Sequence, residues 1–412
     1  MNWKKKFVRN WGRLGMKCKL SDICVFRKGK VDVSKLTLKT YISTENMLPN
    51  KGGVTEASSL PTVQLTQEYK KGDILVSNIR PYFKKIWQAK CDGGCSSDVL
   101  VFQGNLNIDG DFLYYILAND DFFAYSMATS KGTKMPRGDK TSIMQYEVPI
   151  FDIDTQRKIA SVLRSLDEKI ELNSTINNNL EQQAQAIFKE WFIDNPENNE
   201  WSTGTFSELI KSTLNGDWGK EAPTGNNTEK VYCIRGADIP EVKAGNKGKM
   251  PTRYILPKNF AAKQLAAGDI VVEISGGSPT QSTGRCTAIT QSLLDRYDSG
   301  MVCTNFCKAM KPKEGYSLFI YYYWQYLYGK GVFFSYENGT TGIKNLDFSG
   351  FIETETILIP PVDKIIAFDD YCKSIFNQIF ANGKQNEHLA VLRDTLLPKL
   401  MSGELDVSDM DL

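Results

Sequence analysis

The sequence predicts an α+β protein built as a pseudo-two-fold tandem repeat, in which two mixed α/β domains alternate with two long antiparallel coiled-coil helices. Three observations predict this architecture. One heptad pattern of apolar residues occurs twice, starting at Ile159 and again at Phe368. The blocks before the two patterns hold short β-rich runs bounded by Gly and Pro, and these runs also recur. The chain has 412 residues and 41% hydrophobic content, which is enough for two or three domains.

The first domain is expected at residues 1–150. Strands are predicted near residues 73–77 and 99–102, and a helix is predicted over residues 111–124. This block holds 23 Lys and Arg residues against 14 Asp and Glu, a net charge of +9, although the whole chain carries only +2. Such an excess of positive charge favours a polyanionic partner.

The first long helix is expected at residues 151–194. Ten positions from 159 to 191 are separated by alternating steps of four and three. Eight of them are apolar, which is typical of a coiled-coil seam. The two exceptions are Asn173 and Asn177.

The second domain is expected at residues 195–359 and repeats the first more loosely. Its surface loops differ in length from those of the first domain, so the offset between matching segments drifts along the chain. The matched features are Gly72-Asp73 with Gly268-Asp269, Val148-Pro149 with Ile359-Pro360, a predicted strand over 269–274 and a predicted helix over 318–328.

The second long helix is expected at residues 360–403 and an acidic tail at 404–412. The heptad pattern returns in this helix with asparagine at the same two positions, Asn382 and Asn386. Residues 360–412 hold five basic and nine acidic side chains, so two acidic helical blocks alternate with two neutral or basic domains.

The four asparagines are predicted to set the register of the helix pair. A buried amide in an apolar seam lowers stability, but it selects a partner that places another amide opposite. In the alternative arrangement, Asn173 and Asn177 face solvent and Ile176 enters the seam.

Two loops of the first domain carry residue types that bind nucleic acids. Arg and Asn can each pair with a base edge through two hydrogen bonds, while Lys contacts phosphates. Either loop alone would be explained as a solvated charged turn, but both loops in a domain of net charge +9 favour binding. The candidates are Asn78, Arg80, Tyr82, Lys84 and Lys85 in one loop and Lys131, Thr133, Lys134 and Arg137 in the other.

The corresponding turn of the second domain is small and polar, and its backbone amides can cradle a phosphate. It is not a Walker A loop, because no Gly-Lys-Ser/Thr ends it. Two halves that share a scaffold and differ in their loops suggest one fold with two specificities. The candidates are Ser278, Thr280, Gln281 and Arg285 in this turn, with Lys220, Arg235, Thr340, Thr341 and Lys344 elsewhere.

Composition and motifs exclude several classes of protein. A single histidine, His388, excludes His-dependent triads and multi-His metal sites. The sequence shows no nuclease or amino-methyltransferase motif. The Cys91–Cys95 and Cys303–Cys307 pairs do not superpose in the repeat, so neither a metal nor a catalytic residue is predicted. The nine scattered cysteines, and the lack of a signal or membrane segment, predict a reduced cytoplasmic protein.

Over essentially its whole length, the chain resembles the specificity subunit of type I restriction-modification systems. The resemblance rests on the duplicated layout and on motifs in both helices. The second helix departs from the pattern, because its start lacks the glutamine found at Gln156. The motifs are Thr155-Gln156-Arg157-Lys158-Ile159-Ala160, Leu166-Asp167-Glu168-Lys169-Ile170, Ala186-Ile187-Phe188-Lys189-Glu190-Trp191-Phe192 and Leu396-Leu397-Pro398-Lys399-Leu400-Met401-Ser402-Gly403-Glu404-Leu405.

The resemblance implies a non-catalytic subunit whose two globular target-recognition domains each read one half of a bipartite double-stranded DNA site. The helices would act as a spacer ruler and as the docking surface for two modification subunits. Those subunits would bind S-adenosylmethionine and methylate adenine, and ATP-dependent restriction subunits would join for cleavage, so this chain itself would hold no cofactor. Phe192, Ile193 and Val391 are then candidate partner contacts. Two other interpretations stay open: a bivalent protein-binding adaptor, or a DNA enzyme with an unrecognised motif.

Overall fold

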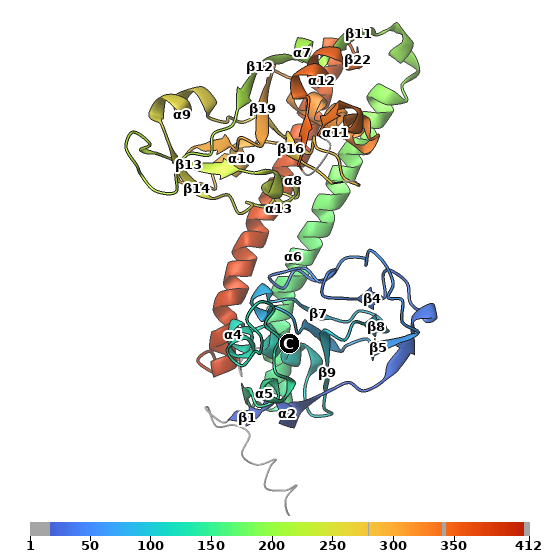
Figure 1. Ribbon diagram of the computed structural model, residues 1–412, viewed down its shortest axis with the longest axis vertical. Coiled ribbons are helices and arrows are strands. Elements are labelled where there is room, and N and C mark those ends of the chain that lie inside the picture. Colours follow the sequence, from blue (N-terminus) through green and yellow to red (C-terminus); the bar gives the residue numbers. More distant parts are fainter. Residues whose placement is uncertain (1–16, 279, 340–342, 408–412) are drawn as a thin grey trace, which may run out of the picture. The chain divides into compact units, whose positions relative to one another are not determined.

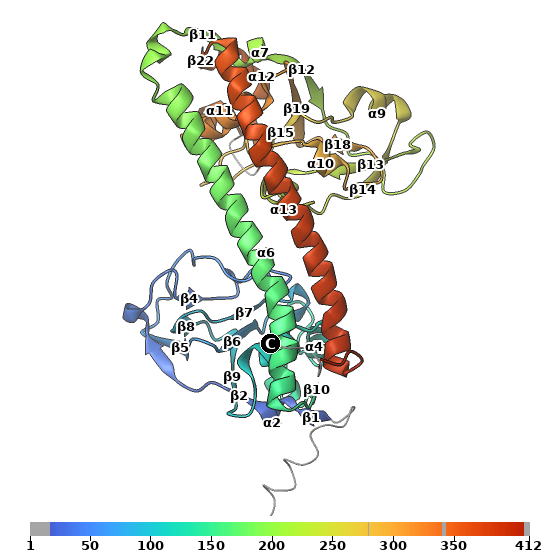
Figure 2. The same ribbon diagram turned by 180° about the vertical axis from the view of Figure 1, so that it is seen from behind.

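The computed structural model describes residues 17–278, 280–339 and 343–407, and its contacts group the chain into two compact units. Unit 1 comprises Met1–Glu168 with Ala390–Leu412, and unit 2 comprises Lys169–Leu389. Each unit therefore combines one α/β portion with segments of both long helices (Figures 1 and 2).

Unit 1 is built around two four-stranded sheets. The first has the order β2 (Cys24–Phe26), β9 (Val99–Gly104), β6 (Ile74–Ser77), β7 (Ile86–Gln88), and all neighbours are antiparallel. The second has the order β3 (Lys30–Asp32), β5 (Leu65–Tyr69), β8 (Gly93–Cys95), β4 (Tyr41–Ile42), and β8 and β4 are parallel. All four residues of the central strand β6 are buried, as its run Ile-Leu-Val-Ser leads one to expect.

The helix predicted over residues 111–124 is found as two helices. They are α3 (Gly110–Ala118) and α4 (Asp120–Ala128), and the prediction of one continuous helix is wrong. Asn119 between them has an extended backbone, and its side chain accepts a hydrogen bond from the Asp121 amide at 3.2 Å. Asparagine is a favoured N-cap residue, so it starts a new helix here rather than continuing the old one. Unit 1 is completed by β1 (Lys17–Lys19) paired with β10 (Glu147–Pro149), α2 (Leu20–Ile23), α5 (Lys140–Ile143) and the short helices η1 (Val33–Lys35) and η2 (Pro81–Phe83).

The main sheet of unit 2 repeats the strand order of the main sheet of unit 1. This four-stranded sheet has the order β12 (Ile210–Asn215), β19 (Cys307–Pro312), β15 (Ile270–Glu273), β17 (Cys286–Ala288), again with antiparallel neighbours. A second sheet has the order β14 (Thr252–Ile255), β13 (Glu229–Ile234), β18 (Met301–Cys303), and β13 and β18 are parallel as β4 and β8 are. The tandem repeat predicted from the sequence is therefore present in the strand order.

The remaining elements of unit 2 surround these sheets. The helix predicted over 318–328 is confirmed as α11 (Ser317–Gly329). A further pair joins β11 (Ser202–Thr205) to β22 (Thr356–Ile359), and a small sheet has the order β16 (Ser275–Gly276), β21 (Lys344–Leu346), β20 (Glu337–Asn338). The other helices are α7 (Phe206–Leu209), α8 (Ile239–Lys243), α9 (Pro257–Lys263), α10 (Gln291–Leu294), α12 (Phe348–Thr354), η4 (Pro196–Glu200), η5 (Gly236–Asp238) and η6 (Val332–Tyr336).

The same buried turn precedes the central strand of each main sheet. Asp73 accepts a hydrogen bond from the Lys70 amide at 2.8 Å and forms an ion pair with Arg27. Asp269 accepts one from the Ala266 amide at 2.8 Å and pairs with Lys311 at 2.9 Å. Both carboxylates are buried, and the glycine before each has a positive φ of about 90°. The repeated Gly-Asp pair therefore closes the turn that positions each central strand.

The two long helices are α6 (Ile153–Phe188) and α13 (Val362–Ser402), and η3 (Lys189–Ile193) extends α6 by a π-helical turn. α6 starts where Asp152 accepts hydrogen bonds from the Thr155 amide and hydroxyl at 2.8 and 2.9 Å. The segments of α6 and α13 within a unit lie side by side (Figures 1 and 2). In unit 1, Arg393 of α13 contacts Asp167 of α6 at 2.6 Å.

The four seam asparagines meet in unit 2 as two amide pairs. Asn173 Nδ2 donates to Asn386 Oδ1 at 2.8 Å, and Asn382 Nδ2 donates to Asn177 Oδ1 at 2.8 Å. From the first pair to the second, the residue number rises along α6 and falls along α13, so the two segments are antiparallel. The four side chains are between 1% and 9% exposed, which excludes the arrangement with Asn173 and Asn177 in solvent. An amide thus lies opposite an amide at both positions.

Two other sequence features of the helices are explained by packing. Phe192 was predicted to face outward, but it is 1% exposed and packs against Phe319 and Phe368 of the unit 2 core, so that prediction is wrong. Gly383 interrupts the helical propensity of α13, yet a Cβ atom there would lie 1.8 Å from the Gly245 carbonyl oxygen. The loop after α8 therefore approaches α13 so closely that only glycine fits.

Replacing Asn173 by Leu should lower the free energy of unfolding by about 1–3 kcal/mol, because the buried Asn386 amide loses its partner. The double variant Asn173→Leu/Asn386→Leu should recover much of that loss, since both polar groups leave the seam. Chemical denaturation of the wild type, both single variants and the double variant measures the coupling. Asn178→Leu on the exposed face of α6 is the control, with a change within about 0.5 kcal/mol. Simple additivity of the two single changes would contradict the amide contact.

Candidate nucleic-acid interface

The two loops of the first domain that were predicted separately lie against each other in unit 1. Ile79 and Arg137 form an antiparallel bridge, and Arg137 also bridges Lys131 across its own hairpin. The Arg80 amide donates to the Pro136 carbonyl at 2.8 Å. Residues 78–80 and the hairpin 131–137 thus form one three-stranded surface, which we call ribbon 1.

Unit 2 has the same arrangement at the equivalent place. β16 follows the central strand β15 as residues 78–80 follow β6, and it pairs with β21 of the hairpin formed by β20 and β21. Ser275 lies opposite Asn345, and Gly276 lies opposite Lys344. We call residues 275–276 with the described part of 337–346 ribbon 2. Of its predicted site residues, Lys344 lies on β21, whereas Thr340 and Thr341 lie outside the described residues.

Most of the predicted cations of unit 1 have acidic or carbonyl partners within the protein. Lys84 pairs with Asp120 at 2.7 Å, Lys131 with Asp139 at 2.5 Å, and Arg137 with Asp98 at 3.1 Å. Lys85 donates to the Thr44 carbonyl at 2.6 Å. No ion pair is found for Arg80 or Lys134 among residues 17–278, 280–339 and 343–407. These two cations can therefore bind a ligand without first breaking an ion pair within the described part of the protein.

The ion pair between Lys131 and Asp139 shows how the hairpin of ribbon 1 is held in place. Hydrogen bonds from Lys131 and from the Ser142 amide lower the pKa of Asp139 to about 2. Asp139 also caps helix α5 through that amide. The carboxylate therefore stays charged at neutral pH and joins the base of the hairpin to a fixed helix.

Ribbon 1 contains polar atoms that the described part of the protein leaves without hydrogen bonds. They are Asn78 Oδ1 and Arg80 Nε, and both are buried. Arg80 also has a φ of 50°, in the left-handed region that few non-glycine residues adopt. Unpaired buried polar atoms and strained backbone are rare in native structures and occur together at binding sites. Tyr82, half-exposed beside Phe83, provides an aromatic ring on the same turn.

The predicted polar turn of unit 2 is largely occupied by its own hydrogen bonds. Ser278 Oγ accepts from the amides of Thr280 and Gln281 at 3.3 and 3.0 Å, and the Thr283 amide donates to Glu337 at 2.6 Å. These three amides are therefore engaged within the protein, and the binding of a phosphate by this turn stays a prediction.

Two arginines predicted as DNA contacts in unit 2 form internal ion pairs. Arg285 binds the buried carboxylate of Glu273 through Nε and Nη2 at 2.8 and 2.7 Å. Arg235 binds Asp238 in the same two-pronged way and also donates to the Lys249 carbonyl at 2.8 Å. These carboxylates raise the pKa of both guanidinium groups, with the side-chain hydrogen bond as the largest cause. Both residues therefore have structural contacts, while Lys220 is exposed.

A cavity of about 560 Å³ lies beside ribbon 2 within unit 2. It brings together residues from the turn after β12, from η5, from ribbon 2 and from the loop after β18. Sequence reasoning missed the loop 304–306, although the match of Cys95 with Cys303 in the repeat marks its position. The main lining residues are Trp218, Arg235, Ser275, Asn305, Phe306 and Ile343.

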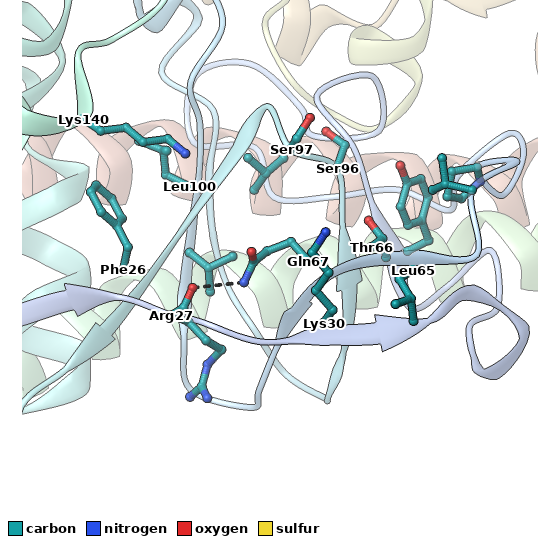
Figure 3. A pocket seen from close by; sticks show the side chains of 15 residues that line it. Phe26, Arg27, Lys30, Leu65, Thr66, Gln67, Ser96, Ser97, Leu100 and Lys140 are labelled. Carbon is teal, nitrogen blue, oxygen red and sulfur yellow. Dashed lines mark hydrogen bonds between the residues drawn. The ribbon is translucent and has the colours of Figure 1, made fainter.

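Unit 1 has a cavity of about 450 Å³ where its two sheets meet (Figure 3). Ser96 and Ser97, which follow β8 as residues 304–305 follow β18, form one side of this cavity together with Lys140. The Gln67 amide donates to the Arg27 carbonyl at 3.0 Å (Figure 3). The Arg27 guanidinium is bound to Asp73, so this cation serves the fold.

No group of three His, Cys, Asp or Glu side chains that could hold a metal ion occurs in the described ranges. No helix in this part of the chain is both long and apolar enough to cross a membrane.

Comparison with known proteins finds a family model, related sequences and a solved structure that are similar to this chain. Residues 15–182 match the family model of the type I restriction modification DNA specificity domain. The HindI specificity subunit, a type I restriction enzyme subunit of Haemophilus influenzae, is 25% identical over 94% of this chain and 98% of its own length. The MjaIX specificity subunit of Methanocaldococcus jannaschii is 27% identical over 73% of this chain and 70% of its own. The crystal structure of the type I restriction-modification S subunit from M. genitalium superposes with a TM-score of 0.55 at 16% identity, covering 97% of this chain and 98% of that one.

The duplicated α/β units and paired helices define a chain with the fold of a restriction-modification S subunit. In sequence, the chain is similar to type I restriction-modification specificity subunits. The resemblance seen in the sequence is thereby confirmed.

Replacing Arg285 by Ala should lower the free energy of unfolding by about 3 kcal/mol, because the buried carboxylate of Glu273 loses its partner. Thermal and chemical denaturation measure the change. The control is Arg157→Ala, which removes an exposed pair with Asp154 and should change stability by less than about 1 kcal/mol. If Arg285→Ala were as stable as the wild type but bound DNA more weakly, Arg285 would contact DNA rather than support the fold.

Proposed function

We propose that this chain is the DNA-recognition subunit of a type I restriction-modification complex, and that each unit reads one half of a bipartite site. The observation that supports this most is the repeated ribbon. Both units place a turn and a hairpin in the same arrangement after the central strand, but with different side chains. One scaffold with two different surfaces is suited to a target made of two different halves.

Ribbon 1 has the chemistry needed to read and hold duplex DNA. Asn78 and Arg80 carry the unsatisfied polar atoms, and their side-chain types pair with adenine and guanine edges. Lys134 and the paired cations Lys131 and Arg137 are placed to contact phosphates, which fix orientation without reading sequence. The paired cations would exchange a carboxylate for a phosphate on binding. The excess positive charge of residues 1–150 supports this role.

Ribbon 2 offers a smaller charge and more neutral groups. Lys344 lies 2.6 Å from Glu337, and Asn345 lies beside it on the strand that faces Ser275. Arg235 lines the cavity beside ribbon 2, and Lys220 is an exposed cation of the same unit. We propose residues 1–150 and 195–359 as the two target-recognition domains, with 151–194 and 360–403 as the helical segments.

The helix pair would set the spacing between half-sites and dock the modification subunits. Val391, on the unit 1 segment of α13, is an exposed apolar side chain at 61% that fits a docking contact. Leu172, on the unit 2 segment of α6, is exposed at 52% and offers a separate contact of the same kind. The modification subunits would carry S-adenosylmethionine and methylate adenine, and the restriction subunits would use ATP. Catalysis would thus reside in the partners, in the cytoplasm where the DNA lies.

Replacing Lys134 by Ala in the chain assembled with its modification subunit should weaken DNA binding to all sequences alike. The slope of log K against log salt should shrink by roughly one, because one phosphate contact is lost. Arg137→Ala should act in the same direction. Titrations at several salt concentrations measure both effects.

Lys39→Ala is the matched control, since Lys39 is an exposed lysine of the same unit that lies outside ribbon 1 and pairs with Glu56. Its slope should equal that of the wild type. If the slope of log K against log salt were unchanged in both Lys134→Ala and Arg137→Ala, ribbon 1 would not contact DNA. Salt-insensitive binding in the wild type would instead favour the protein-binding adaptor.

A further inference from the structure

The two units differ in chemistry at one equivalent position beside the ribbons. β8 and β18 end at Cys95 and Cys303, and the third residue after each is Asp98 and Phe306. In unit 1, Asp98 forms an ion pair with Arg137 of ribbon 1 at 3.1 Å. In unit 2, Phe306 takes this place and lines the cavity beside ribbon 2. An ionic contact in one unit is thus replaced by an exposed aromatic ring in the other.

Three apolar side chains from separate segments surround this cavity. Trp218, Phe306 and Ile343 are 37%, 59% and 63% exposed, although each is large and apolar. Trp218 is backed by the Arg253 guanidinium, 4.2 Å from its ring centroid. Exposed apolar side chains gathered around one cavity indicate a surface that is covered when a ligand binds.

The backbone holds Phe306 in place while its ring stays open to solvent. The amides of Ile274 and Ser275 donate to the Phe306 carbonyl at 2.9 and 3.2 Å. The Phe306 amide is 3.3 Å from Thr304 Oγ1. The backbone that carries the ring is therefore held by the same turn that forms ribbon 2.

This apolar group is continuous with the proposed DNA-binding surface. Ser275 and Gly276 belong both to ribbon 2 and to the cavity wall, and Ile343 directly precedes Lys344 of ribbon 2. Arg235 and Glu273 also line the cavity, and each is paired within the protein, with Asp238 and with Arg285. The exposed apolar side chains are therefore the groups that this rim offers to DNA bound on ribbon 2.

The major groove of DNA carries only one apolar group on its base edges, the 5-methyl group of thymine. We propose that unit 2 recognises thymine in its half-site, and that the 5-methyl group packs against Phe306 and Ile343 at the cavity rim. This inference rests on the proposed function and names the base that the second unit selects. Unit 1 has the ion pair between Asp98 and Arg137 at the equivalent place, so it offers no such apolar contact there.

The test uses the full chain assembled with its modification subunit and a random duplex library. Sequencing of the bound fraction for the wild type and for Phe306→Ala identifies the positions at which the variant loses base preference. These positions should be thymine on one strand. Thymine at each of them is then replaced by uracil, which lacks only the methyl group. The wild type should lose about three- to tenfold in affinity, the size expected for one buried methyl contact.

The same uracil substitution should have no effect on Phe306→Ala, since the contact is already gone. Ile343→Ala should show a reduced uracil effect, and Leu106→Ala, a fully exposed apolar residue of unit 1, should behave as the wild type. Three results would overturn the inference: a relaxed position that is not thymine, a uracil substitution that is neutral in the wild type, or no relaxed position. If the uracil substitution were neutral in the wild type while Phe306→Ala still weakened binding, the ring would stack on a base or sugar and would not contact the methyl group. If the wild-type complex bound no DNA from the library, the proposed function would be rejected as well.

Discussion

The buried contact between amides of α6 and α13 is the constraint on which the pairing of the two helices depends. An apolar seam alone tolerates a shift of one helical turn, because leucine and isoleucine pack against many partners. Asn173 with Asn386 and Asn177 with Asn382 remove this freedom, since any shift would bury amides without hydrogen bonds. Asn177 also donates to the Ala244 and Ile379 carbonyls, so the loop after α8 is held in the same register. Gly383 then provides the space for that loop to touch α13.

The repeat shows which parts of the fold are scaffold and which parts carry specificity. The strand order, the buried Gly-Asp turn and the ribbon are shared by both units. The cation that neutralises the buried aspartate already differs, Arg27 in one unit and Lys311 in the other, because either satisfies the same charge. At the surface the differences change the chemistry itself, as with Asp98 and Phe306. Conserving the interior and varying the loops lets one fold read two sequences.

The sequence was sufficient for the features that follow from periodicity. The heptad ladder predicted both long helices and the amide positions, and the repeated Gly-Asp pair located the central strands. Local patterns did not reveal that residues 78–80 and 131–137 form one ribbon, because that pairing joins segments more than fifty residues apart. The partners of Arg285 and Arg235 are only 12 and 3 residues away, but a carboxylate that binds an arginine is not marked in the sequence. Phe192 was misplaced because the heptad pattern describes the seam between the helices and not the α/β core packed on their other side.

The central claim is that two units of one scaffold read two separate halves of a DNA site. The most direct measurement is selection from a random duplex library by the chain assembled with its modification subunit, followed by sequencing of the bound fraction. The account predicts two short specific blocks separated by an unspecified spacer of constant length, and exchange of residues 195–359 for those of another family member should replace one block only. A single contiguous motif, or two blocks with a variable spacer, would contradict the account.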